Sequence, residues 1–143
     1  MKTCKLLREQ VAAATGSKKA ELVLKNAQIV NVFTQSVETG DIAIEGGYIV
    51  GIGNYEGITE KDLGGAYVCP GFLDGHIHIE SSMTSPGEFE RAVVPHGTIA
   101  VITDPHEIAN VAGTAGIRFM MQSAQKLDLD VYFMLPSCVP ATD

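Results

Sequence analysis

The alternation of strand and helix patterns after Pro70 most narrowly limits the folds open to this chain of 143 residues. Apolar runs of strand type lie at 71–76, 99–103 and 130–135, and helical patterns lie between them at 86–94 and 116–127. Strand, helix, strand, helix, strand is the pattern of a parallel sheet or barrel. The sequence therefore predicts an α/β fold for residues 70–143.

Residues 21–69 have a different pattern, in which short β-type runs follow one another with no helical periodicity between them. Strands are predicted at 22–24, 29–32, 41–44 and 48–52, with turns at 25–26, 39–40, 46–47 and 53–54. The pair Gly46 and Gly47 between two apolar runs predicts a hairpin. We expect a small antiparallel β unit here, after a lead-in of residues 1–20 that carries a helix over 5–14.

Composition excludes several classes of function. The net charge of −7 argues against nucleic acid or an anionic membrane as the main partner, although it permits a small neutral substrate. No apolar run is long enough to cross a bilayer or to form a signal-peptide core, so we expect a cytoplasmic protein. Cys4, Cys69 and Cys138 are far apart and odd in number, which predicts reduced and mostly buried thiols.

His76 and His78 form the strongest local signal for chemistry. Two histidines at i and i+2 on an extended segment point the same way, so both imidazoles can reach one metal ion. Asp74 and Glu80 continue the same alternation and could line the same face. The alternative is a pair of partly exposed strand histidines without a ligand. The position at the end of a strand favours the metal site, because chemistry gathers at that end of parallel strands.

A second cluster follows the next predicted strand and contains Asp104, His106 and Glu107. In a parallel arrangement it lies beside the first cluster, where it could bind metal, orient a ligand or move a proton. Alternatively, Asp104 caps a short helix that begins with Pro105. Glu80 has two interpretations as well, since it could support a metal-binding histidine or only cap a turn.

The run from Ala66 to His78 resembles the first barrel strand of the amidohydrolase superfamily, and the run 21–53 resembles its N-terminal β-sandwich half. Three further runs, at 76–83, 104–111 and 135–142, resemble the adenine deaminase family. The resemblance implies that residues 70–143 begin a (β/α)8 TIM-type barrel, which is incomplete in this chain. Residues 21–69 would then be half of a small antiparallel β-sandwich subdomain.

The resemblance also implies an activity, the hydrolytic deamination of adenine to hypoxanthine and ammonia by a metal-activated hydroxide. The divalent metal is typically Mn²⁺ or Fe²⁺ in this family, with Zn²⁺ possible, and His76 and His78 match the first metal ligands. The remaining ligands and a catalytic aspartate come from later strands, beyond Asp143. We therefore expect an N-terminal part of such an enzyme, inactive and poorly stable as a monomer, whose full-length form is a homo-oligomer that binds adenine.

Other functions stay open at the level of sequence. A related amidohydrolase of the dihydropyrimidinase or dihydroorotase kind would open a cyclic amide instead of releasing ammonia from adenine. A non-catalytic truncated product would form a stable complex with another protein. A small metal-binding module would bind its ion only modestly through two ligands, so a chelator would change its stability little.

Overall fold

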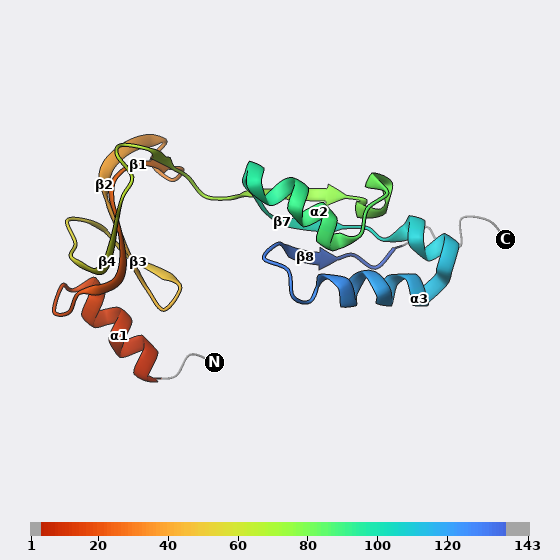
Figure 1. The fold of residues 1–143 in the computed structure, drawn as a ribbon, viewed down its shortest axis with the longest axis horizontal. Coiled ribbons are helices and arrows are strands. Elements are labelled where there is room, and N and C mark those ends of the chain that lie inside the picture. The colour runs from red at the N-terminus through yellow and green to blue at the C-terminus, as the bar shows by residue number, and fades with distance from the viewer. Residues whose placement is uncertain (1–3, 137–143) are drawn as a thin grey trace. The chain divides into compact units, whose positions relative to one another are not determined.

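The computed structural model describes residues 4–136, and it divides the chain after Pro70 into two compact units. The first unit contains helix α1 (Cys4–Ala14) and the strands β1 (Ala20–Asn31), β2 (Ser36–Glu45), β3 (Tyr48–Gly53), β4 (Gly57–Asp62) and β5 (Tyr67–Val68). The helix predicted over 5–14 is confirmed. Figure 1 shows α1 beside the end of this sheet.

The five strands of the first unit form one mixed sheet with the order β3-β2-β1-β4, in which β5 also pairs with β1. The pairs β1–β2 and β2–β3 are antiparallel, but β4 and β5 run parallel to β1. The expectation of a purely antiparallel unit is therefore wrong for the last two strands. Most residues of β4 are exposed and polar, so it carries little of the apolar alternation by which a strand is recognised.

Two predicted turns of the first unit lie inside strands. Lys25 and Asn26 form a bulge in β1, where Asn26 has φ 56° and its N–H donates to Asp41 Oδ1 at 3.1 Å. Asparagine tolerates this left-handed conformation, so β1 continues through it. Gly40 lies within β2, opposite Ala27 of β1.

The turn that joins β1 to β2 was missed in the sequence. Asn31 Oδ1 accepts hydrogen bonds from the N–H groups of Phe33 and Thr34 at 3.1 and 3.2 Å, which closes the turn over residues 32–35. This is the turn that an asparagine side chain forms with the backbone ahead of it. By contrast, the hairpin at Gly46 and Gly47 is confirmed, with φ 58° and 76°.

Lys25 and Asp41 form an ion pair between neighbouring strands of the first unit, with side chains 25% and 11% exposed. Lys25 Nζ also donates to the carbonyl of Tyr55 at 2.9 Å. The hydrogen bond from Lys25, helped by the backbone N–H groups of Asn26 and Tyr55, holds the pKa of Asp41 below its ordinary value. The pair therefore stabilises the fold above the ordinary pKa of aspartate, and this contribution is lost as the pH falls through the lower folded value.

Asp41→Asn is expected to destabilise the first unit by about 1 to 3 kcal/mol at neutral pH, because Lys25 loses its charged partner. Urea titrations followed by far-UV circular dichroism at pH 7 and below about pH 4 measure this difference. The loss should shrink as the pH falls below the ordinary pKa of aspartate, because the carboxylate of the unfolded chain is protonated first and the ion pair then contributes less to stability. Asp128→Asn, an exposed carboxylate in the other unit, serves as the control. An equal loss at both pH values would contradict this account.

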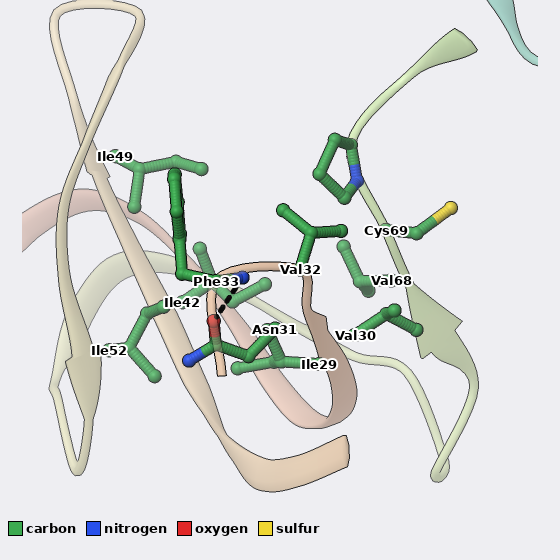
Figure 2. A pocket seen from close by; sticks show the side chains of 11 residues that line it. Ile29, Val30, Asn31, Val32, Phe33, Ile42, Ile49, Ile52, Val68 and Cys69 are labelled. Atoms are coloured by element: carbon green, nitrogen blue, oxygen red, sulfur yellow. Dashed lines mark hydrogen bonds between the residues drawn. The ribbon is translucent and has the colours of Figure 1, made fainter. Parts of the chain in front are cut away.

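An apolar hollow of about 340 Å³ lies on the first unit (Figure 2). Its wall includes Ile29, Ile42, Ile52 and Val68, and Phe33 beside it is 95% exposed. The wall also contains Cys69 and Asn31, and Oδ1 of Asn31 already accepts the two turn hydrogen bonds. The hollow therefore offers mainly apolar contact.

The second unit alternates strands and helices as the sequence predicts. It contains β6 (Phe72–Ile77), the 3-10 helix η1 (Ile79–Ser82), α2 (Pro86–Val93), the 3-10 helix η2 (Val94–His96), β7 (Thr98–Thr103), α3 (His106–Ala124) and β8 (Asp130–Phe133). The strands form a parallel sheet in the order β6-β7-β8, and Figure 1 shows β7 and β8 side by side. The chain is thus a mixed α/β protein.

One face of the parallel sheet is covered by helices and the other is open. The covered face carries a buried cluster in which Ile79 and Val101 meet Phe89 of α2, Met120 of α3 and Leu129. The open face carries Leu73, Ile102 and Tyr132, which are 73%, 40% and 58% exposed. Strand β7 was predicted to be covered on both faces, and within this chain that prediction is wrong.

Two smaller expectations, for the start of α3 and for the burial of the cysteines, need correction. Helix α3 begins at His106, ten residues before the predicted start, and Gly113 interrupts it with φ 58° and ψ −148°. Cys4 and Cys69 are exposed, so the expectation of buried thiols is wrong for both, and Cys138 lies outside the described residues. Within the described part of the chain, no helix is long and apolar enough to span a membrane.

Candidate metal centre

The two histidines of the H-x-H motif lie at the carboxyl end of β6. His76 is inside the strand, and His78 follows its last residue, Ile77, whose side chain packs against the buried cluster. Because neighbouring side chains on an extended segment point to opposite sides, both imidazoles face away from that cluster. Their Nε2 atoms are 3.2 Å apart. Two nitrogen donors about 2.1 Å from one ion lie about 3 to 3.5 Å apart, so this separation suits a shared metal.

A backbone carbonyl fixes the tautomer of His78. Its Nδ1 lies 2.8 Å from the carbonyl oxygen of Asp104, at the end of the neighbouring strand β7. A carbonyl only accepts hydrogen bonds, so Nδ1 must carry the proton and Nε2 of the neutral ring presents a lone pair. This is the arrangement that holds histidine ligands in metal sites.

Asp104 lies beside both imidazoles. His76, His78 and Asp104 each offer one possible ligand atom, and these three atoms lie within 4.8 Å of one another. Oδ2 of Asp104 lies 3.3 Å from Nδ1 of His106, whereas Oδ1 is buried and has no hydrogen-bond partner among the described residues. Two imidazole nitrogens and a carboxylate oxygen form a donor set suited to Mn²⁺, Fe²⁺ or Zn²⁺. The residues present therefore fit a divalent metal.

The rest of the second predicted cluster lies close by. The ring of His106 stacks edge-on against that of His78, with 4.6 Å between the centroids. Glu107 Oε1 accepts a hydrogen bond from Ser81 Oγ at 2.6 Å, which joins η1 to the start of α3. The structure thus brings together the groups that follow β6 and β7, as expected for parallel strands.

Glu80 does not continue the alternation of His76 and His78. The strand ends at Ile77, and Glu80 lies in η1, where its Oε1 accepts from the N–H of Ile108 at 3.2 Å. The predicted shared face for residues 74, 76, 78 and 80 is therefore wrong at Glu80. It fails at Asp74 as well, because the pairing of β6 with β7 shifts register between Asp74 and Ile77. Glu80 instead joins η1 to the first turn of α3.

Glu80→Ala is expected to destabilise the second unit by about 1 kcal/mol, because the N–H of Ile108 loses its acceptor at the start of a helix. The free energy of unfolding from urea titration measures the loss. Glu80→Gln keeps a side-chain oxygen and should stay close to the parent. If Glu80→Gln is as damaging as Glu80→Ala, charge and not the hydrogen bond explains the role of Glu80.

One alternative interpretation from the sequence is resolved by the geometry. Asp104 does not cap α3, because Pro105 occupies the N-cap position and the helix has no side-chain cap hydrogen bond there. His96 ends η2, and Gly97 follows with φ 96°, so this histidine lies at the end of a helix. Ser137 and Cys138 lie outside the described residues.

The comparisons with known proteins identify the family of the chain. The model of the amidohydrolase family matches residues 67–143, more than half of the chain. The chain therefore belongs to the amidohydrolase family, which is metal-dependent. Among solved structures, N-acyl-D-glutamate deacylase from Bordetella bronchiseptica, complexed with zinc and a phosphonate inhibitor, matches with a TM-score of 0.50 at 21% identity. The match covers 60% of this chain and 19% of that chain, and it shows a similar fold.

The curated relatives are more similar. "Adenine deaminase 2" of Carboxydothermus hydrogenoformans is 59% identical over 138 residues, which are 96% of this chain and 24% of the relative. The adenine deaminase of Geobacillus kaustophilus is 60% identical over 94% of this chain and 23% of its own length. That of Listeria monocytogenes is 50% identical over 100% of this chain and 25% of its own length. The chain spans about a quarter of the length of the curated relatives it matches.

Proposed function

We propose that these 143 residues are the N-terminal part of a cytoplasmic enzyme that hydrolyses adenine to hypoxanthine and ammonia. The observation that carries the proposal is the 59% and 60% identity to adenine deaminases over almost the whole chain. It concerns the whole enzyme, because the chain spans only about a quarter of those relatives. We expect the whole enzyme to be a homo-oligomer and the chain alone to be inactive.

In this proposal, residues 70–143 supply the first three strands of a (β/α)8 barrel. The parallel order β6-β7-β8 supports this, as does the open apolar face, which the interior of a barrel would enclose. Residues 21–69 are half of a β-sandwich subdomain, after a lead-in of residues 1–20. The apolar hollow lined by Ile29, Ile42 and Ile52 supports a sandwich, because such a sheet packs a second apolar layer against one face.

His76 and His78 would hold a divalent metal, Mn²⁺ or Fe²⁺ in preference to Zn²⁺, which when bound lowers the pKa of water and supplies a nucleophile near neutral pH. The chain's own residues prepare this site. The Asp104 carbonyl keeps the proton of His78 on Nδ1, and the β6–β7 pairing holds the two ends together. Glu80 and Ser81 connect η1 to the first turn of α3, which begins at His106, directly after Asp104 and Pro105.

The reaction consumes one water and releases one ammonia for each adenine, so two products report it independently. The test incubates the whole enzyme, reconstituted with Mn²⁺ or Fe²⁺, with adenine in one reaction and with dihydrouracil in another. We expect hypoxanthine and ammonia in equal amounts from adenine, and no ring opening of dihydrouracil. Hydrolysis of the cyclic amide without release of ammonia from adenine would replace the proposal with the rival amidohydrolase chemistry.

A further inference from the structure

We propose that the carboxylate of Asp104 is itself a ligand of the metal held by His76 and His78, so that two neighbouring strands contribute to the same ion. The inference rests on the proposed metal site and adds a residue that the H-x-H motif does not contain. It gives the centre three protein ligands within this chain, the number that catalytic zinc sites typically use.

The position of Asp104 supports this role. The residue follows β7, and the N–H of Asp104 donates to the carbonyl of Ile77 at 3.0 Å, while its own carbonyl accepts from His78. These two bonds join the loop after β7 to the segment that bears the histidines. The backbone beside the carboxylate is therefore fixed on both sides, which limits the entropy lost when an ion is bound.

The hydrogen bonding of the carboxylate leaves one oxygen available. Oδ2 lies against Nδ1 of His106, and Oδ1 is buried with no partner in residues 4–136. A buried carboxylate oxygen without a hydrogen bond is costly, and a cation would remove that cost. The side chain of Asp104 is 16% exposed, so water compensates for little of it. One ring nitrogen of His78 and one carboxylate oxygen of Asp104 belong to the same cluster of ligand atoms.

His106 then acts on Asp104 and not on the ion. Its Nδ1 lies against Oδ2, and the cluster of ligand atoms contains His76, His78 and Asp104 without it. An imidazole in this position orients a coordinating carboxylate, as outer partners do in metal sites generally. Glu107 is likewise outside the cluster, with its carboxylate bonded to Ser81.

The test replaces the carboxylate with a thiol and uses Co²⁺ as the probe. If residue 104 touches the ion, Asp104→Cys in the purified whole enzyme loaded with Co²⁺ should gain a thiolate-to-cobalt charge-transfer band in the near ultraviolet. Glu107→Cys is the matched control, and we expect no new band from it. The parent protein, which already contains Cys4, Cys69 and Cys138, sets the baseline.

Asp104→Asn provides a second measurement that does not depend on a cysteine. We expect its Kd for Co²⁺ to rise at least about tenfold, and the visible bands of the saturated protein to shift as an anionic donor is lost. A residue that acted only through another would weaken binding and leave the spectrum of the saturated protein unchanged. Far-UV circular dichroism confirms that each variant compared is folded.

The outcomes separate this inference from the proposed function. If His76→Ala abolishes Co²⁺ binding but Asp104→Cys adds no band and Asp104→Asn leaves the spectrum unchanged, the metal site stands and Asp104 is not a ligand. If His76→Ala binds Co²⁺ as the parent does, the metal site itself is wrong. A new band in Asp104→Cys that is absent from Glu107→Cys establishes the third ligand.

Discussion

Replacing His76 with alanine is expected to weaken Mn²⁺ binding by more than about a hundredfold. Loss of an outer partner of a metal ligand costs about tenfold to a hundredfold in affinity, and loss of the ligand itself should cost more. His78→Ala should have an effect at least as large, because it also removes the bond from Nδ1 to the Asp104 carbonyl. Isothermal titration of the metal-free protein with Mn²⁺ measures both Kd values.

His96→Ala is the matched control for these two substitutions. It removes the same kind of side chain from the same unit. His96 is exposed at the end of η2, and the cluster of ligand atoms found among the described residues does not include it. We expect its Kd for Mn²⁺ to equal that of the parent. An effect of His96→Ala as large as that of His76→Ala would mean that the binding is not specific to the H-x-H motif.

Ile79→Ala is expected to lower the free energy of unfolding of the second unit by about 3 to 4 kcal/mol. Ile79 is 0% exposed and lies in the cluster with Phe89, Val101 and Leu129, directly after the two histidines of the candidate metal site. Alanine leaves a cavity there, because a packed interior relaxes only in part around a missing side chain. Urea titration followed by far-UV circular dichroism gives the difference.

Val111→Ala tests whether that loss comes from burial. Val111 is 84% exposed on α3, and alanine is the better helix former, so we expect a change within about 0.5 kcal/mol. Binding of Mn²⁺ should also weaken in Ile79→Ala, since the loop that follows His78 loses its anchor. A loss below about 1 kcal/mol for Ile79→Ala would show that this cluster does not hold the metal-binding segment in place.

The parallel sheet of the second unit followed directly from the sequence, because its strands and helices differ in period and in apolar content. Strands β6 and β7 were predicted within one residue of their observed bounds, and the alternation of helices required them to be parallel. The sequence does not predict that α3 begins at His106, because the side chains of His106 and Glu107 carry no helical periodicity.

The first unit was harder to predict because its sheet depends on contacts that are distant in sequence. Asparagine is a common turn residue, and Asn26 does adopt the left-handed conformation of a turn. Because β1 pairs with β2 on both sides of it, Asn26 forms a bulge in a continuous strand. Strand β4 is exposed and polar, and it is a strand only because β1 offers it a parallel partner. Neither the bulge at Asn26 nor the parallel pairing of β4 can be predicted from the residues in its own neighbourhood of the sequence.

The metal site shows the same division. His76 and His78 are a local motif, and the spacing alone was enough to select them. The position of Asp104 beside the two histidines depends on hydrogen bonds that join the ends of β6 and β7 across 26 residues of sequence, and the sequence alone does not contain these contacts. Glu80 was assigned to the wrong face because the sequence does not show that the strand stops at Ile77 and a 3-10 helix begins.

The most direct test of the central claim is the release of ammonia from adenine by the whole enzyme, measured after chelation, after reloading with Mn²⁺ or Fe²⁺, and again with His76→Ala. We predict turnover that disappears on chelation, returns with the metal and is absent from the His76→Ala variant. Turnover that survives both chelation and His76→Ala, or no turnover by the reloaded parent enzyme, would contradict the assignment of this chain to a metal-dependent adenine deaminase.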